Sequence, residues 1–127
     1  MYLLDTHALL WFLDDDAKLP VATKELIGTS PDVYVSIASF WKVAIKSSIG
    51  KLKLNDSITR IMELCSEKKI TVLPIKAAHL ERLRTLPFIH KDPFDRLLIC
   101  QAQAEDMTLI TVDENIPKYD VRTKWDS

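Results

Sequence analysis

Residues 92–113, DPFDRLLICQAQAEDMTLITVD, decide the predicted fold of this chain. An Asp before a Pro, followed by an apolar-periodic run, predicts a helix over Pro93–Glu105 with the Asp as its N-cap. The run at 109–112 is apolar and too short for a helix, so it predicts a buried strand that ends at an Asp. A helix that leads into a buried strand is typical of parallel α/β sheets.

The same alternation extends outward from this stretch over the rest of the chain. Further strands are predicted at 2–4, 33–35, 71–73 and 121–123, and further helices at 8–13, 20–27, 37–49, 57–68 and 77–84. Gly28 and Gly50 follow two of the helical patterns, where a left-handed residue commonly ends a helix. We therefore expect an α/β fold with a mainly parallel central sheet of four to five strands and helices on both faces.

Length and charge limit the classes of function. At 127 residues the chain fits one domain, 1–127, because domains are typically roughly 100–200 residues long. Its 17 Lys and Arg against 18 Asp and Glu give a formal charge of −1, so nucleic-acid binding requires a local basic patch. With only 2 glycines, the sequence lacks the Gly-rich loops that bind phosphates or dinucleotides.

The sequence does not predict membrane insertion. Its most apolar N-terminal stretch, 2–13, contains polar residues and falls short of the roughly 20 residues that a membrane span needs. It also lacks the basic leader of a targeting signal. Cys65 and Cys100 fall in apolar helical patterns, so we expect two buried free thiols and a cytoplasmic protein.

Acidic residues gather where predicted strands end and a predicted helix begins. Asp5 ends the first strand, Asp113 ends the strand at 109–112, and Asp92 and Asp95 open the helix between 93 and 105. Ligands of an open parallel sheet bind beyond the carboxyl ends of its strands, so these acids are expected at one edge. Several carboxylates repel unless a cation lies between them, and a hard divalent ion, Mg²⁺ or Mn²⁺, prefers oxygen ligands. Such a site hydrolyses phosphodiesters without a Ser or Cys nucleophile.

Each of these acids also has a structural explanation. Asp92 precedes Pro93 as an N-cap would, and Asp95 suits the first turn of the helix. Asp5 and Asp113 could cap the turns that follow them. The residues alone leave both interpretations open.

Four blocks of sequence resemble a known family. They are LLDTH at 3–7, VSIASFW at 35–41, HKDPFDRLLICQA at 90–102 and LITVD at 109–113. In this order and spacing they resemble the PIN domains of VapC-like toxins over nearly the whole chain, and DPFDR is the most specific block. The resemblance implies a PIN-like three-layer fold and a metal-dependent endoribonuclease that is the toxin of a toxin–antitoxin pair.

The resemblance also assigns functional residues. The metal-binding acids of the family correspond to Asp5, Asp95 and Asp113, with Asp92 as an accessory catalytic acid. Polar groups that often lie beside the metal correspond to Ser36 and Thr111.

Lys42 departs from the family pattern, which has a Glu directly after the Trp of this helix. An ammonium donates hydrogen bonds and cannot bind Mg²⁺. Lys42 could enter the acidic cluster as its counter-ion and leave an inactive fold, or extend into solvent so that three aspartates hold one cation. We therefore expect weakened nuclease activity, with complete loss as the alternative.

Basic residues near the acids predict contacts with a phosphodiester backbone. Lys46 lies one helical turn beyond Lys42, while His90, Lys91 and Arg96 flank the acids of the DPFDR block. We expect Lys46 and Arg96 to bind RNA phosphates, although Lys46 also suits a solvated helix face.

The resemblance further implies a homodimer and an antitoxin peptide in a groove beside the early helices. The competing hypothesis is a catalytically inactive PIN-domain relative that binds RNA or an antitoxin without cleavage. A third hypothesis is a receiver-like or phosphatase-like domain. A phosphatase of the haloacid dehalogenase type requires a second Asp two residues after the first, and His7 occupies that position.

Overall fold

The computed structural model describes residues 1–126 and has a five-stranded sheet at its centre. The strands are β1 (Tyr2–Leu4), β2 (Val33–Ser36), β3 (Ile70–Leu73), β4 (Thr108–Ile110) and β5 (Thr123–Lys124). Their order is β3-β2-β1-β4-β5, and the four neighbouring pairs are parallel. The predicted α/β fold with a parallel sheet is therefore confirmed.

The helices alternate with the strands, as the sequence pattern predicted. They are α1 (Thr6–Leu13), α2 (Val21–Thr29), α3 (Ile37–Ser48), α4 (Ile58–Glu67), α5 (Ala77–Thr85), α6 (Pro93–Glu105) and a 3₁₀ turn, η1 (Ile116–Lys118). Two strand boundaries differ from the prediction by two residues, and the others agree to within one residue. The strand predicted at 109–112 ends at Ile110, and the strand predicted at 121–123 begins only at Thr123.

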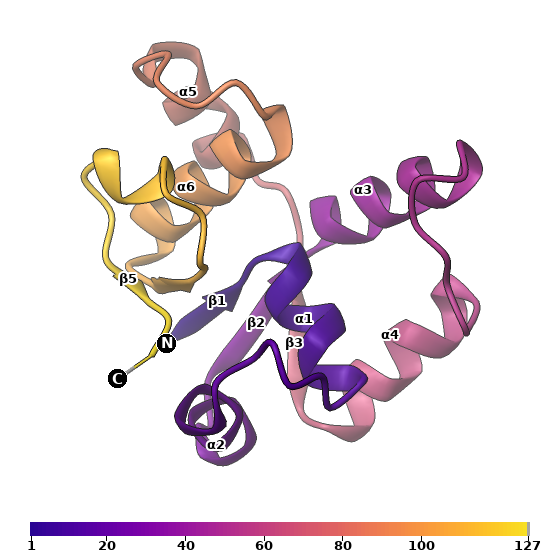
Figure 1. Cartoon of the computed structure of the whole chain (residues 1–127). Coiled ribbons are helices and arrows are strands. Elements are labelled where there is room, and N and C mark those ends of the chain that lie inside the picture. The colour runs from indigo at the N-terminus through magenta and orange to yellow at the C-terminus, as the bar shows by residue number, and fades with distance from the viewer. Residues whose placement is uncertain (127) are drawn as a thin grey trace.

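Helices cover both faces of the sheet because successive strand residues point to opposite sides. Leu4 and its β4 neighbour Ile110 are fully buried in a core with residues of α1, α2 and α4. Leu3 and its neighbour Leu109 are fully buried on the other face against α6. Figure 1 shows α1, α2 and α4 on one side of the strands and α5 and α6 on the other.

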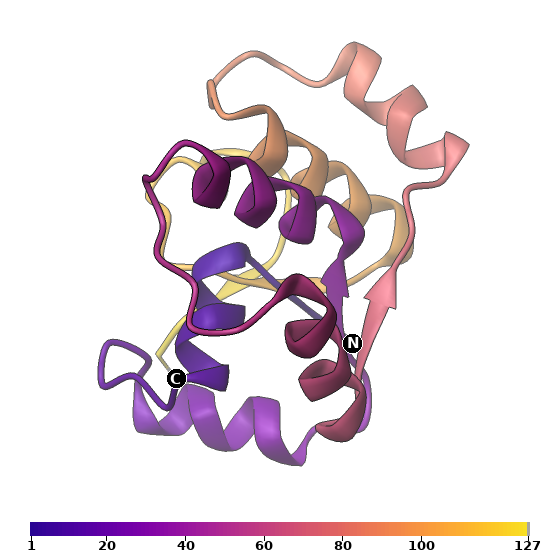
Figure 2. The same ribbon diagram turned by 90° about the vertical axis from the view of Figure 1, so that its right-hand side faces the viewer.

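The carboxyl ends of the central strands lead directly into helices. Asp5 separates β1 from α1, and Ser36 is both the last residue of β2 and the N-cap of α3. From there α3 runs along α6, which it contacts (Figure 2). The N-terminus of α6 therefore comes close to the segments that follow β1 and β2.

Within residues 1–126, no helix is both long enough and apolar enough to cross a membrane.

Candidate active site

Asp5 has two roles in the structure, because it caps a helix and also lines a cavity. Its side-chain Oδ1 accepts a hydrogen bond from the backbone N–H of Ala8 at 2.8 Å, so Asp5 caps α1. The side chain is buried but lines a cavity at the carboxyl edge of the sheet. Burial raises the pKa of Asp5, although hydrogen bonds from the Thr111 hydroxyl and the Ala8 N–H act in the opposite direction.

Asp92 begins α6 and holds a lysine. Its Oδ1 accepts hydrogen bonds from the backbone N–H groups of Phe94 and Asp95, at 2.8 and 3.2 Å. Its Oδ2 accepts a hydrogen bond from the Lys42 ammonium at 3.0 Å. Burial alone would raise the pKa of Asp92, but the Lys42 ammonium and the two N–H donors lower it below its usual value.

Asp95, in the first turn of α6, is a half-buried acid with a raised pKa. Burial raises its pKa to about 6, and the nearby negative charges of Asp92 and Asp5 add to this effect. The Lys42 ammonium, 3.8 Å from Asp95 Oδ1, lowers the pKa without restoring its usual value. The positive charges beside Asp95 therefore do not offset the cost of burying its charged form.

Asp113 follows β4 and caps the turn that leads into η1. Its Oδ1 accepts the backbone N–H groups of Asn115 and Ile116, at 2.8 and 3.2 Å, and its own N–H donates to the Thr111 hydroxyl at 3.1 Å. Burial would raise the pKa of Asp113, but the Asn115 N–H and a hydrogen bond with His90 lower it. Asp113 thus stays ionised while its Oδ2 faces the cavity side of the turn.

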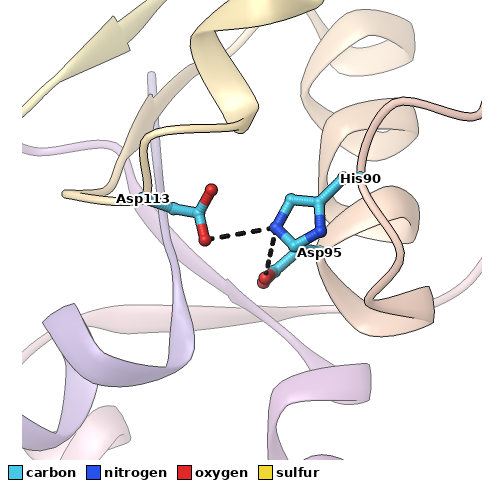
Figure 3. Close-up of side chains that lie close together, drawn as sticks. All are labelled: His90, Asp95 and Asp113. Atoms are coloured by element: carbon cyan, nitrogen blue, oxygen red, sulfur yellow. Dashed lines mark hydrogen bonds and ion pairs between the residues drawn. The ribbon is translucent and has the colours of Figure 1, made fainter.

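His90 lies between two of the acids, as Figure 3 shows. Its Nε2 is 3.1 Å from an oxygen of Asp95 and 3.1 Å from an oxygen of Asp113. Its Nδ1 accepts a hydrogen bond from the backbone N–H of Asp92 at 3.1 Å. Because Nδ1 is an acceptor, the ring proton lies on Nε2, where it points at the two carboxylates. His90 was predicted only as a basic neighbour of the acids, and its position between them was missed.

The loop before α6 holds His90 in place. The Tyr119 hydroxyl accepts the backbone N–H groups of Ile89 and His90, at 2.9 and 2.7 Å, and donates to the carbonyl oxygen of Pro87 at 2.7 Å. The Arg96 guanidinium donates to the same carbonyl at 3.0 Å and lies over the Phe88 ring. The Arg96 guanidinium thus makes its hydrogen bonds with this loop.

Lys42 points into the site. It is only 8% exposed, and its ammonium meets Asp92 and Asp95 as described above. Of the two orientations that the sequence left open, the structure has the inward one. The ammonium pairs with the two acids that open α6.

The structure brings most of the predicted residues to one cavity of about 240 Å³. Its lining includes Asp5, Lys42, Lys46, His90, Asp92, Asp95 and Asp113. Three predicted residues do not line it. Ser36 is fully buried and caps α3, Thr111 lies behind Asp5 and Asp113, and Arg96 faces the loop at 86–90.

The donor set of the cavity fits a hard divalent cation. Within residues 1–126, one ligand atom from each of His90, Asp95 and Asp113 lies within 4.8 Å of the others. The proton on His90 Nε2 makes the carboxylate oxygens the available ligands, which suits Mg²⁺ or Mn²⁺. Burial keeps the pKa of Asp95 raised even with Lys42 beside it, so a bound cation would favour the ionised form of this carboxyl group. The residues therefore fit such an ion, provided that His90 gives up its contacts with the two acids.

Comparisons with known proteins agree with this fold. The model of the PIN domain family matches residues 2–122. A structure of VapBC2 from Rickettsia felis bound to a promoter DNA fragment is similar with a TM-score of 0.72 at 15% identity, and 98% of each chain is covered. FitAB bound to the IR36 DNA fragment gives 0.68 at 18%, covering 98% of this chain and 94% of that one. VapBC-1 from nontypeable Haemophilus influenzae gives 0.68 at 18%, covering 97% and 96%. No curated protein matches the sequence.

Proposed function

Because the chain belongs to the PIN domain family, we propose that it is a metal-dependent endoribonuclease, the toxin component of a toxin–antitoxin pair. The observation that carries this proposal is the shared cavity, in which four aspartates from three separate segments meet two lysines. Acids held together at the carboxyl edge of a parallel sheet are suited to phosphodiester hydrolysis. The family match over 2–122 supports the further proposal that 1–127 works as one PIN-like domain.

The four aspartates take different roles in this proposal. Asp5, Asp95 and Asp113 hold Mg²⁺ or Mn²⁺, while Asp92 orients Lys42 and fixes the start of α6. A bound cation would supply a hydroxide nucleophile at neutral pH and neutralise charge on the phosphate. The chain holds the acids in place beforehand, because Asp5, Asp92 and Asp113 each accept backbone N–H groups.

Lys42 sets the level of activity. Its ammonium pairs with Asp92 and Asp95, so it competes with a cation for the same negative charge. A cation would still stabilise ionised Asp95, because Lys42 does not offset the cost of burying this carboxylate and its pKa stays raised to about 6. We therefore propose a nuclease that is weakened by Lys42 and not abolished.

An RNA cleavage assay tests this proposal. We expect the wild type to cleave RNA with Mg²⁺ or Mn²⁺, EDTA to stop cleavage, and Asp5→Asn to abolish it because the substitution removes a ligand charge. Lys42→Glu should increase cleavage, since it adds a carboxylate to the site and removes the ammonium. Lys68→Glu is the matched control, because Lys68 precedes β3 at the opposite edge of the sheet. Cleavage that survives Asp5→Asn would contradict the proposal.

A second candidate function is an inactive relative that binds RNA or an antitoxin without cleavage. The specific observation in its favour is the Lys42 ammonium at 3.0 Å from Asp92, inside the cavity. This hypothesis predicts that neither Mg²⁺ nor Mn²⁺ raises the melting temperature of the wild type, whereas the nuclease hypothesis predicts a rise. Differential scanning calorimetry with and without each ion separates the two.

For the antitoxin, we propose a groove between α1 and the segment before α4. It has a volume of about 190 Å³, and its lining combines apolar side chains, among them Leu10, Trp11 and Leu54, with the acids Asp14 and Asp16. These features suit a peptide with apolar anchors and basic flanks. The similar structures are described as toxin–antitoxin complexes or as complexes with DNA, which supports this kind of partner.

Two further predictions concern assembly and location. The homodimer that the family resemblance implies is checked by light scattering of the purified chain. A cytoplasmic location is proposed because Cys65 and Cys100 are buried free thiols, which suit a reducing compartment.

A further inference from the structure

The imidazole of His90 contacts carboxylate oxygens that a cation would need. Its Nε2 lies 3.1 Å from Asp95 Oδ2 and 3.1 Å from Asp113 Oδ2, and the Asp113 contact has the geometry of a hydrogen bond (Figure 3). The other oxygen of Asp113 already accepts two backbone N–H groups. The single proton on Nε2 thus faces two acceptors, and both belong to ligands of the proposed cation.

Two other contacts keep the His90 ring in the cavity if it loses these acceptors. Nδ1 accepts the backbone N–H of Asp92 at 3.1 Å, which keeps the proton on Nε2. The His90 backbone N–H donates to the Tyr119 hydroxyl at 2.7 Å. The residue is 8% exposed and lines the acidic cavity. The Nε2–H group therefore stays inside and needs a new acceptor, because an unpaired buried donor costs stability.

The substrate of the proposed reaction supplies such an acceptor. Lys42 and Lys46, which line the same cavity, are donors only, and the carboxylates of the cavity are the groups that a cation takes. A phosphodiester brings negatively charged nonbridging oxygens, which are strong acceptors. A fixed N–H that meets one of them stabilises the charge that develops during the reaction.

We propose that His90 is a further catalytic residue, whose Nε2–H donates a hydrogen bond to a nonbridging oxygen of the phosphodiester that is cleaved. This inference rests on the proposed function, because it requires Asp95 and Asp113 to turn from His90 to a cation. The proton stays on Nε2 throughout, and no bond to His90 forms or breaks. His90 then acts on the phosphate as a positioned N–H acts in an oxyanion hole.

Two substitutions separate the donor at Nε2 from the acceptor at Nδ1. His90→Asn places an amide oxygen near the position of Nδ1, where it can accept the Asp92 N–H, but has no donor at the position of Nε2. His90→Gln reaches the position of Nε2 with an amide N–H and is the matched control. We expect His90→Asn to lower kcat about 100-fold with a KM changed only a few-fold, and His90→Gln to stay within about tenfold of the wild type.

NMR of the imidazole nitrogens tests the release of His90 without any cleavage. Mg²⁺ added without RNA should move the His90 signals, because its Nε2–H loses carboxylate acceptors, and inorganic phosphate added afterwards should move them again. His79 is the internal reference, since it makes similar contacts with Lys76 and Glu105 on α5, outside the cavity. Its signals should stay unchanged in both titrations. The rise in melting temperature shows when Mg²⁺ saturates the site.

Three results would overturn the catalytic role of His90. They are His90 signals that ignore saturating Mg²⁺ or the added phosphate, a His90→Asn variant that cleaves RNA at the wild-type rate, and equal losses in the Asn and Gln variants. The last result would leave His90 a structural role alone.

Failure of the proposed function looks different. A wild type that never cleaves RNA, but whose His90 signals respond to Mg²⁺ and then to phosphate, keeps the donor and loses the nuclease. A wild type whose melting temperature and His90 signals both ignore Mg²⁺ contradicts the two proposals together.

Discussion

Two buried histidines of this chain make the same local contacts in different surroundings. His79 Nδ1 accepts the backbone N–H of Lys76 at 3.0 Å, and its Nε2 lies 3.0 Å from Glu105. His90 Nδ1 accepts a backbone N–H at 3.1 Å, and its Nε2 lies 3.1 Å from each of two carboxylates. The two imidazoles therefore differ mainly in the acids that they face.

The pKa values of Glu105 and Asp95 shift in opposite directions, whereas that of Asp113 is lowered like that of Glu105. The hydrogen bond from His79 lowers the pKa of Glu105, with further help from the Lys76 ammonium at 3.2 Å. The pKa of Asp95 is raised to about 6 by burial and by the neighbouring acids. One carboxylate with two donors is a stabilising arrangement, whereas several carboxylates in one cavity cost stability and leave negative charge for a ligand.

The largest expected effect is on catalysis. Asp95→Asn should reduce RNA cleavage about 100-fold or more, because it removes a charged ligand of the cation. Glu105→Gln makes the same chemical change beside the other histidine and should leave cleavage unchanged. Initial rates with Mn²⁺ at matched protein concentrations test the pair, and equal losses in both variants would remove the functional distinction between the two histidines.

The second-largest expected effect is on the stability of the fold around His79. His79→Ala should lower the free energy of unfolding by about 2 kcal/mol, because it leaves a cavity and unpaired buried polar groups. His7→Ala is the control, since His7 is exposed and should cost little. Urea unfolding at pH 7 measures both variants, and similar values for the two would contradict the structural role of His79.

The third effect is on cation binding. Lys42→Glu should tighten Mn²⁺ binding roughly tenfold or more, since a carboxylate replaces an ammonium that pairs with Asp92 and Asp95. Isothermal titration calorimetry measures the affinity, with Lys68→Glu as a variant of equal charge change far from the site. Equal affinities for the two variants would show that Lys42 does not compete with the cation.

The smallest effect is a change in how stability depends on pH. Folded Asp95 binds its proton up to about pH 6, whereas its usual pKa is 3.8, so stability from this group rises as pH falls through that window. Asp95→Asn should therefore stabilise the metal-free protein by about 1 kcal/mol at pH 7.5 and have little effect near pH 4.

Glu105 should show the opposite sign. Its pKa is lowered on folding, so its contribution to stability is present above the usual Glu value of 4.5 and is lost as pH falls through the folded value. Glu105→Gln should destabilise the protein at pH 7.5. Thermal unfolding in EDTA at the two pH values checks both variants, and the same sign for both at pH 7.5 would contradict the comparison.

The sequence predicted the fold well because the strands are short, apolar and clearly separated. It also predicted which acids share a cavity, since Asp5 and Asp113 follow neighbouring parallel strands. The choice between cap and cavity residue proved unnecessary, because Asp5, Asp92 and Asp113 each cap a turn with Oδ1 and leave Oδ2 for other partners. In Asp92 and Asp113 that second oxygen contacts another side chain of the site. A carboxylate has two oxygens, and this allows both roles.

The sequence did not predict where several side chains of the site point. The place of His90 depends on long-range hydrogen bonds from its loop to Tyr119, and no local pattern encodes such a contact. Arg96 turns away from the cavity because the carbonyl groups of Leu86 and Pro87 offer acceptors. The inward direction of Lys42 likewise depends on Asp92, which lies 50 positions away in the chain.

The Tyr119 hydroxyl joins two parts of the molecule that each carry an acid. It lies just after η1, in the segment of Asp113, and holds the backbone of residues 87–90, in the segment that leads to Asp95. A single hydroxyl group therefore connects the two segments through its hydrogen bonds. If Asp95 and Asp113 must move apart to admit a cation, the hydrogen bonds of Tyr119 limit how far the two segments can separate.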